Sequence, residues 1–323
     1  MKHKDILVIG GAGFVGRHLV AALAARGARV TVPARQRERA KHLLMLPTVD
    51  VVSADVNDPK VLSRLVKGRD AVVNLAGVLH SRRGRPDERG PNDYGPDFAR
   101  AHVELPQSLI SACREHGVKR VLHMSALGAH PHGPSEYLRS KGIGEGVVLA
   151  AEDVVATVFR PSVIFGPEDS FLNLFATLAK FSPALILICP EARFQPVYVG
   201  DVVRAFVAAL DDRDPAGMRH DLCGPRVYTM RELAKYVCDV TGRRRLFFDM
   251  PDWLARLEAR LWELTPFPIF TRDNLASMTQ PSTSDEAMPY GILPVSMESM
   301  APTWLTPASP REHYTDLRLR ARR

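Results

Sequence analysis

Six short apolar runs, separated by stretches long enough for helices, constrain the fold of this chain more than any other feature. They lie at residues 6–9, 29–32, 49–53, 71–75, 120–124 and 154–159. Because most of these runs are continuously apolar, they are typical of strands buried on both faces, and the amphipathic stretches between them indicate helices. The pattern predicts an α/β fold of the Rossmann type, a doubly wound parallel sheet with helices on both faces.

The rhythm breaks after Arg160, where prolines become frequent, so we expect a second lobe there. With 46% hydrophobic and 24% charged residues among 323, the composition is that of a globular protein and excludes a disordered or collagen-like chain. We expect a Rossmann domain over 1–165, completed by part of 195–225. A small α-rich lobe is expected over 166–305, and a basic tail over 306–323.

Charge and cysteine usage exclude several kinds of partner and site. The 43 Lys and Arg exceed the 36 Asp and Glu only moderately and are scattered, so we expect no nucleic-acid partner. The four cysteines lack metal-binding spacing, and we expect neither a disulfide framework nor a metal site. Arg17 and His18 interrupt the N-terminal apolar run, so we expect no export signal and a cytoplasmic location.

A glycine-rich turn, Gly-Gly-Ala-Gly-Phe-Val-Gly at residues 10–16, follows the first apolar run directly and opens a helix pattern. Glycine lets a diphosphate approach the backbone N–H groups at a helix start, where the helix dipole favours negative charge. The alternative is a tight turn that serves only packing. The residues expected to bind the diphosphate of a dinucleotide are Gly10, Gly13, Phe14, Val15 and Gly16.

The residues after the second apolar run predict which dinucleotide is bound. No Asp or Glu occurs from residue 17 to 36, where an acidic side chain would bind the ribose hydroxyls of NAD. Arg35 and Arg37 follow the run instead, and their guanidinium groups suit a 2′-phosphate. We therefore expect NADP(H), with Arg35 as the main contact and Arg37 as the second. The alternative is that both arginines are simply solvent-exposed residues at the start of a helix.

Two further pairs of residues end the third and fourth runs, at the same predicted edge of the sheet. Asp55 and Val56 are expected beside the adenine ring. Ala76 and Gly77, in the sequence Asn-Leu-Ala-Gly, are expected beside the nicotinamide half. Each pair is a weak signal alone, and their order along the chain is what supports them.

Three residues are the candidates for catalysis. Tyr137 and Lys141 are four positions apart, which on a helix places them on one face. A lysine ammonium near the phenol lowers the tyrosine pKa, so Tyr137 could exchange a proton with a substrate oxygen during hydride transfer. Lys141 could also bind the nicotinamide ribose, and Ser125 could polarise a carbonyl. The alternative is a pair that holds the cofactor without turnover.

Together these motifs resemble the short-chain dehydrogenase/reductase superfamily, in its extended or atypical branch. The sequence Arg-Pro-Ser-Val-Ile-Phe-Gly-Pro at 160–167 adds to the resemblance, which implies that Pro161 lies at the cofactor. One position departs from the pattern. The active hydroxyl of that branch usually lies one residue after Ser125, and this chain has Ala126 there.

More narrowly, residues 135–145 and 293–305 are similar to bacterial relatives of the NADPH-binding accessory subunit of mitochondrial complex I. That resemblance implies tightly held NADP(H), a role near ubiquinone or the respiratory chain, and a peripheral position at the inner membrane. We expect an NADP-dependent oxidoreductase acting on a hydrophobic or quinone-related carbonyl or alcohol. Two alternatives stay open: a non-catalytic NADPH-holding subunit or assembly factor of a respiratory complex, and a nucleotide-sugar epimerase or dehydratase.

Two segments are candidates for contacts beyond the cofactor. Residues 80–94 are rich in arginine and could admit an anionic substrate or lipid headgroup, although a solvated loop is the interpretation we favour. A helix is expected over 251–264, and its apolar stripe is expected to pack inside its own lobe, with a membrane interface or partner groove as the alternative. That stripe comprises Trp253, Leu254, Leu257, Leu261 and Leu264.

Overall fold

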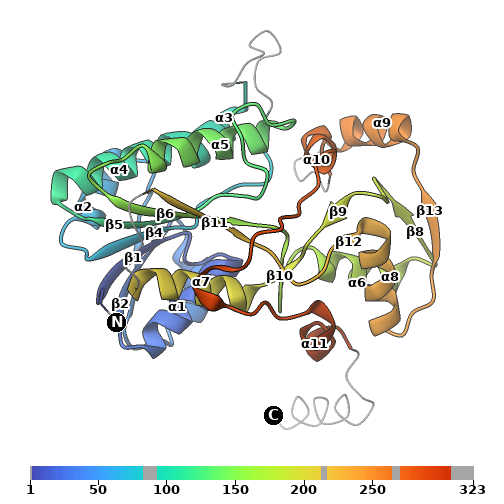
Figure 1. Ribbon diagram of the computed structural model, residues 1–323, viewed down its shortest axis with the longest axis horizontal. Coiled ribbons are helices and arrows are strands. Elements are labelled where there is room, and N and C mark those ends of the chain that lie inside the picture. The colour runs from blue at the N-terminus through green and yellow to red at the C-terminus, as the bar shows by residue number, and fades with distance from the viewer. Residues whose placement is uncertain (1, 83–92, 212–216, 264–269, 307–323) are drawn as a thin grey trace.

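The computed structural model describes residues 2–82, 93–211, 217–263 and 270–306. These residues form a sheet of seven parallel strands in the order β11-β6-β5-β4-β1-β2-β3 (Figure 1). The predicted doubly wound parallel sheet is thereby confirmed. The strands are β1 Asp5–Ile9, β2 Arg29–Ala34, β3 Val49–Ser53, β4 Ala71–Asn74, β5 Arg120–Met124, β6 Val155–Pro161 and β11 Met218–Leu222.

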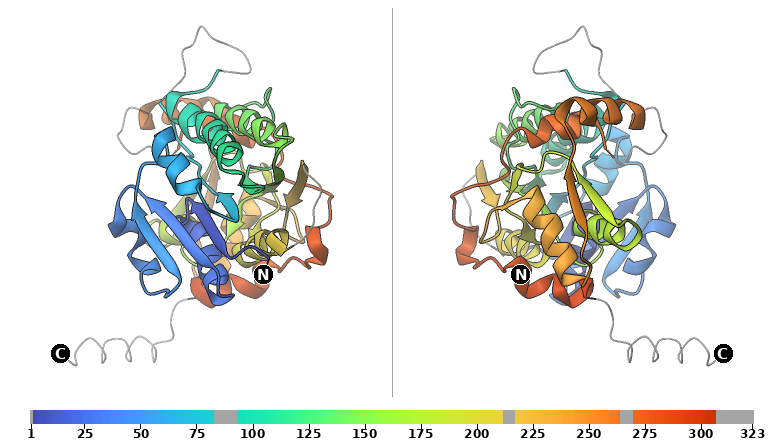
Figure 2. Two further views of the ribbon diagram at one scale, coloured as in Figure 1. Left: turned by 90° about the vertical axis from the view of Figure 1, so that its left-hand side faces the viewer. Right: turned by 90° about the vertical axis from the view of Figure 1, so that its right-hand side faces the viewer.

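Helices cover both faces of this sheet (Figures 1 and 2). On one face α1 (Phe14–Ala25) packs against α7 (Val199–Asp211), and on the other α4 (Leu105–His116) packs between α2 (Pro59–Val66) and α5 (Glu136–Leu149). Successive side chains of a strand enter opposite cores, so Leu7 lies with the second group of helices and Val8 with the first. Both faces are covered, which explains why the apolar runs do not alternate. Three short elements, η1 Arg37–Leu43, α3 Pro96–Phe98 and the π-helical turn η2 Ala99–Glu104, complete this domain.

The second group of elements has its own apolar core, which includes Phe165, Leu172 and Leu233. Strand β8 (Ala184–Leu187) pairs in parallel with β13 (Leu246–Asp249). Two short strand pairs, β7 Ile164–Phe165 with β10 Val197–Tyr198 and β9 Arg193–Phe194 with β12 Tyr228–Thr229, also contribute to this core through Phe165, Phe194 and Tyr228 (Figure 1). The helices are α6 Leu172–Phe181, α8 Met230–Val240, α9 Asp252–Trp262, α10 Arg272–Met278, α11 Met297–Met300 and α12 Pro302–Leu305.

Residues 281–306, here named the closing segment, join the two cores. Met288 packs in the core between the sheet and α7, whereas Met297 and Leu305 are buried in the core of the second lobe. The backbone N–H of Val295 donates to the buried carboxylate of Asp201 on α7, at 2.6 Å. The closing segment also contains the 3₁₀ turn η3 Pro289–Gly291. It therefore belongs to both lobes in packing, although our sequence division assigns it to the second.

Helix α9 differs from the expectation. Its large apolar side chains face solvent, with exposed fractions of 68% for Trp253, 48% for Leu257 and 60% for Leu261, whereas Ala255 and Ala259 are buried. The expectation that the stripe packs inside its own lobe is wrong, because α9 uses its small side chains for the buried face. Leu264, residues 83–92 of the arginine-rich loop and residues 307–323 of the basic tail lie outside the described residues. No helix in the described ranges is long and apolar enough to cross a membrane.

Candidate functional site

The glycine turn has room for backbone only. Gly10 has a left-handed φ of +79°, and a Cβ there would lie 2.9 Å from the carbonyl carbon of Leu75. A Cβ on Gly16 would lie 2.3 Å from the carbonyl oxygen of Gly10. Helix α1 begins directly after Gly13 with Phe14 and Val15, and it has neither a side-chain cap nor an acidic residue in its first turn. Its first N–H groups are therefore available to an anion.

Arg35 and Arg37 are both exposed and come directly after β2, at the carboxyl edge of the sheet. Arg17, close behind the glycine turn on α1, is a residue that the sequence reasoning missed. Its guanidinium pairs with Glu168, and its buried Nε has no hydrogen-bond partner among the described residues. A cation near a helix N-terminus is unfavourable with respect to the helix dipole. The position of Arg17 so close to the start of the predicted helix is therefore a sequence signal for an anion-binding site. Burial, and secondly the charge of Arg17, lower the pKa of His42, which lies in η1 beyond Arg37.

The residues expected beside the two bases follow the ends of β3 and β4. The exposed Asp55 accepts hydrogen bonds from the backbone N–H and the side-chain amide of Asn57, at 3.1 and 2.7 Å. Val56 packs against the core under α2 and α4. The N–H of Ala76 donates to the Asn74 side chain at 3.1 Å, which fixes the turn before the exposed Gly77.

Lys141 is brought to that turn. Its side chain is buried, and Nζ donates to the carbonyl oxygen of Met124 at 3.1 Å and to that of Ala76 at 3.5 Å. A Cβ on Gly77 would lie 3.1 Å from the same Nζ. Burial lowers the pKa of Lys141 to about 8. Pro161 is the last residue of β6, the strand next to β5, and so lies at the carboxyl edge of the sheet. Its carbonyl oxygen accepts a hydrogen bond from the N–H of Leu127 at 3.0 Å.

Tyr137 lies in the first turn of α5, with its ring edge-on to His102 at 5.5 Å between centroids. The Asp273 carboxylate accepts the backbone N–H groups of Glu136 and Tyr137, at 2.7 and 3.2 Å. Burial, and secondly the Asp273 charge, raise the pKa of Tyr137 to about 12. The expectation that Lys141 lowers this pKa is wrong here, because desolvation of the phenolate and a nearby carboxylate both favour the protonated phenol.

Among the described residues, the Ser125 side chain makes no hydrogen bond with Tyr137 or Lys141. Its hydroxyl donates to the buried Glu145 carboxylate at 2.8 Å, and the same carboxylate binds Arg160 at 2.6 Å and Arg219 at 3.1 Å. Ser125 is therefore part of a buried ion network between α5, β6 and β11. The next residue, Ala126, is buried and has no hydroxyl to offer.

His102, which sequence reasoning also missed, connects Tyr137 to the β4 turn. His102 Nε2 accepts the N–H of Val78 at 3.1 Å, so by this pairing Nδ1 carries the proton and donates to Ser140 at 2.9 Å. The Ser140 hydroxyl donates in turn to the carbonyl oxygen of Tyr137 at 2.9 Å. Burial, and then Lys141, lower the pKa of His102 to about 2, so this histidine is neutral.

His123 at the end of β5 is a second buried histidine in this region. Its Nδ1 lies 3.2 Å from the side-chain nitrogen of Asn74, and its buried Nε2 finds no hydrogen-bond partner in the part of the chain that the structure describes. Burial, and then Lys141, lower its pKa to about 3. Lys141 is therefore the cation of this cluster. No spacing in the sequence indicates the two histidines, because each meets its partners only through the fold.

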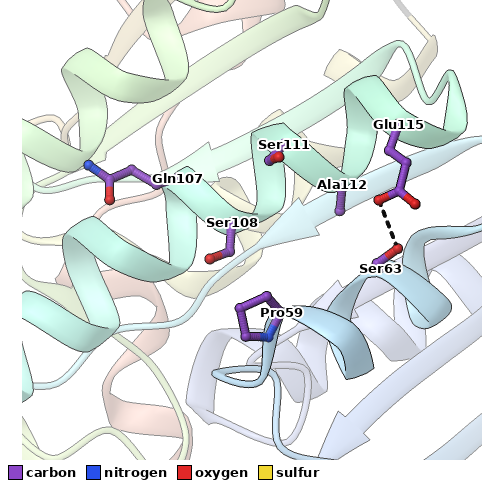
Figure 3. Close-up of a pocket in the computed structure, with 7 residues that line it drawn as sticks. All are labelled: Pro59, Ser63, Gln107, Ser108, Ser111, Ala112 and Glu115. Carbon is purple, nitrogen blue, oxygen red and sulfur yellow. Dashed lines mark hydrogen bonds between the residues drawn. The ribbon is translucent and has the colours of Figure 1, made fainter.

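A separate hollow of about 320 Å³ lies between α2 and α4 (Figure 3). Pro59 and Ser63 line it from α2, and Ser108 and Glu115 line it from α4, with Ser63 donating to Glu115 at 3.1 Å. None of the residues that line this hollow is one that the sequence assigns to the site.

Residues 6–222 match the model of the NAD dependent epimerase/dehydratase family. The chain belongs to the NAD-dependent epimerase/dehydratase family. Nicotinamide dinucleotides are the cofactor class of this family, and the predicted short-chain dehydrogenase/reductase resemblance is confirmed.

Two relatives are similar to this chain over most of its length. NADH dehydrogenase (ubiquinone) 1 alpha subcomplex subunit 9 of Mus musculus mitochondria is 32% identical over 274 residues, 83% of this chain and 70% of the relative. A ceramide reductase of Caulobacter vibrioides is 33% identical over 250 residues, 76% of this chain and 74% of the relative. The resemblance to the complex I subunit is therefore confirmed.

Among solved structures, a UDP-glucuronic acid 4-epimerase of Bacillus cereus in complex with UDP-glucuronic acid and NAD superposes with a TM-score of 0.66. The two chains are 19% identical, and the superposition covers 87% of this chain and 95% of the epimerase. At this identity the likeness establishes the fold that the two family members share.

Proposed function

We propose that this chain binds NADP(H) and uses it to reduce a hydrophobic or quinone-related carbonyl compound. The observation that carries the proposal is the position of Lys141, whose buried ammonium is held by the carbonyl oxygens of Ala76 and Met124 next to the open backbone of Gly77. In this family fold, that edge of the sheet is where a dinucleotide crosses from one half of the domain to the other.

The residues fit such a cofactor. The uncapped first turn of α1, with Gly10, Gly13 and Gly16 clearing its approach, would bind the diphosphate. Arg35, with Arg37 two positions further along the chain, would bind the 2′-phosphate. The adenine half would lie by Asp55 and Val56. The nicotinamide half would lie by Ala76, Gly77 and Pro161, with Lys141 on its ribose.

A bound nicotinamide supplies the hydride. Tyr137 would supply the proton, because a phenol with a pKa of about 12 keeps its proton at neutral pH and can give it to a substrate oxygen. This favours the direction of reduction. The chain from His102 through Ser140 to the Tyr137 carbonyl would hold the first turn of α5 in place while the proton moves.

A second candidate is an NADPH-holding subunit or assembly factor of a respiratory complex, at the surface of the inner membrane. A specific observation favours it: the Ser125 hydroxyl is engaged by Glu145, and Ala126 lacks one, so no serine at this position polarises a carbonyl. The complex I subunit among the relatives supports this candidate, and the ceramide reductase supports the first.

Calorimetric titration of NADPH and NADH tests the cofactor assignment. Wild-type protein is expected to bind NADPH more tightly, and Arg35→Ala to weaken NADPH by about tenfold while leaving NADH unchanged. Arg64→Ala, which removes an exposed arginine of α2, is the control for net charge. Equal Kd values for the two dinucleotides would overturn the choice of NADP(H).

A second measurement separates the two candidates. NADPH absorbance is followed in the presence of hydrophobic ketones and short-chain quinones, with Tyr137→Phe as the variant. Oxidation that is lost in Tyr137→Phe supports the reductase. Cofactor that stays bound and unreactive in both proteins supports the holding subunit.

A further inference from the structure

A groove of about 1170 Å³ lies on the second lobe between α9 and α10, on the scale of ligand pockets in general. Its walls are mostly apolar, and two residues of the exposed α9 stripe, Trp253 and Leu257, line one of them. Helix α9 contributes Trp253, Arg256, Leu257 and Arg260 to the lining, and α10 contributes Arg272 and Leu275.

Helix α10 connects the groove to Tyr137. Leu275 and Ala276 lie three and four positions after Arg272, so one face of this short helix forms a wall of the groove. From the same helix, Asp273 accepts the N–H of Tyr137 at 3.2 Å, and Ser277 hydrogen-bonds to Ser135 at 2.8 Å. The groove and the first turn of α5 are therefore attached to one helix.

Charge on the other wall is unbalanced. Arg256 and Arg260, four positions apart on α9, are exposed and make no hydrogen bond or ion pair with the described residues. Arg272 is already paired with Glu263, at 2.6 Å. Asp252 is the acidic residue of the lining, so the two free guanidinium groups leave the groove positive.

We infer that this groove binds one acyl chain of an amphiphile with an anionic headgroup. The chain lies along Trp253, Leu257 and Leu275, and the headgroup binds Arg256 and Arg260. Concave walls on two helices enclose a single chain better than they fit a bilayer surface. If the amphiphile is also the substrate that the protein reduces, the inference rests on the proposed function. Binding of the amphiphile in the groove does not depend on the proposed function.

Dodecyl phosphate, used below its micellar concentration and without dinucleotide, is the probe, and its Kd is measured by calorimetry. Dodecyl maltoside presents the same chain without the charge, and inorganic phosphate presents the charge without the chain. Dodecyl phosphate is expected to bind about tenfold more tightly than dodecyl maltoside, and inorganic phosphate is expected not to bind.

Two variants divide the contributions of charge and chain. Arg256→Gln with Arg260→Gln is expected to weaken dodecyl phosphate about tenfold and to leave dodecyl maltoside unchanged. Leu257→Asp is expected to weaken both. Arg64→Gln on α2 with Lys67→Gln at the C-cap of that helix removes the same charge from exposed positions far along the chain and is expected to change neither.

Three results would overturn the inference: equal affinity for both amphiphiles, equal losses in the α9 and α2 double variants, or binding to phosphatidylglycerol vesicles without binding of monomeric dodecyl phosphate. Because no dinucleotide is present, a failure here is separate from a failure of NADPH binding. Thermal melts of each variant confirm that the folded protein is what is measured.

Discussion

At the scale of single residues, Lys141 lies in the most unusual environment for its type. Below pH 8 its ammonium is buried and charged, which destabilises the fold, because burial lowers its pKa to about 8 from 10.5. Between these values the unfolded chain holds more protons than the folded one, so stability rises with pH through this window. Compared with Lys141→Met, the wild type is expected to gain up to about 3 kcal/mol from pH 8 to 10.5 in urea unfolding. Identical pH profiles would contradict this.

The hydrogen bond from Ser125 to Glu145 indicates a structural role, whereas its position in the sequence predicts a catalytic one. Ser125→Ala removes a hydrogen bond to the buried Glu145 and is expected to lower the free energy of unfolding by about 1–2 kcal/mol. NADPH affinity and any reductase rate are expected to stay unchanged. A large loss of rate without a loss of stability would return Ser125 to the catalytic set.

The partners of these residues explain how far the site can be read from sequence. Spacing alone puts Tyr137 and Lys141 on one helix face. It carries no information about Asp273, which is 136 positions from Tyr137 and raises its pKa, or about Glu145, which takes the Ser125 hydroxyl. Environment, and with it the pKa of each group, is set by such long-range contacts.

At the scale of elements, the glycine turn gives a prediction with a matched control. Gly10→Ala combines a left-handed φ with a Cβ 2.9 Å from Leu75, and is expected to abolish dinucleotide binding and to cost about 3 kcal/mol of stability. Gly68 has a similar φ of +74° and nothing within 4 Å. Gly68→Ala is expected to cost about 1–2 kcal/mol and to leave binding intact. Calorimetry and urea unfolding measure both effects, and equal binding by both variants would contradict the role of Gly10.

Elements were predictable where one physical signal dominates. The strands follow continuous apolar runs, and all six predicted strands occur within about two residues of their expected ends. Helix α9 exists as its periodicity predicts, but Trp253 and Leu257 are exposed and Ala255 is buried. Periodicity shows that a helix has an apolar face and does not show whether that face meets the protein or something else.

At the scale of the whole molecule, the closing segment predicts that both lobes unfold together. Met288 is buried in the first core and Leu305 in the second, on one continuous piece of chain. Met288→Ala and Leu305→Ala are each expected to cost about 2–5 kcal/mol and to shift one common calorimetric transition. Two resolved transitions, with each variant shifting only one, would show that the lobes unfold separately.

The division of the chain was harder to predict than its fold class. Helix α7 and strand β11 return to the large sheet after the second lobe has begun, and the closing segment then packs against both cores. From the sequence we expect part of 195–225 to complete the first domain, and β11, within that range, pairs with β6. No local signal in the sequence indicates that the closing segment packs against both cores.

Helix α10 contacts the start of α5 on one side and the groove on the other. Its carboxylate at Asp273 holds the amide hydrogens of Glu136 and Tyr137, while Leu275 and Ala276 form a wall of the groove. A ligand bound against that wall would shift α10. A shift of α10 would change the hydrogen bonds that Asp273 accepts from the start of α5. Ligand binding in the groove would then be coupled to proton transfer from the Tyr137 phenol, because Asp273 on α10 contributes to the pKa of that phenol.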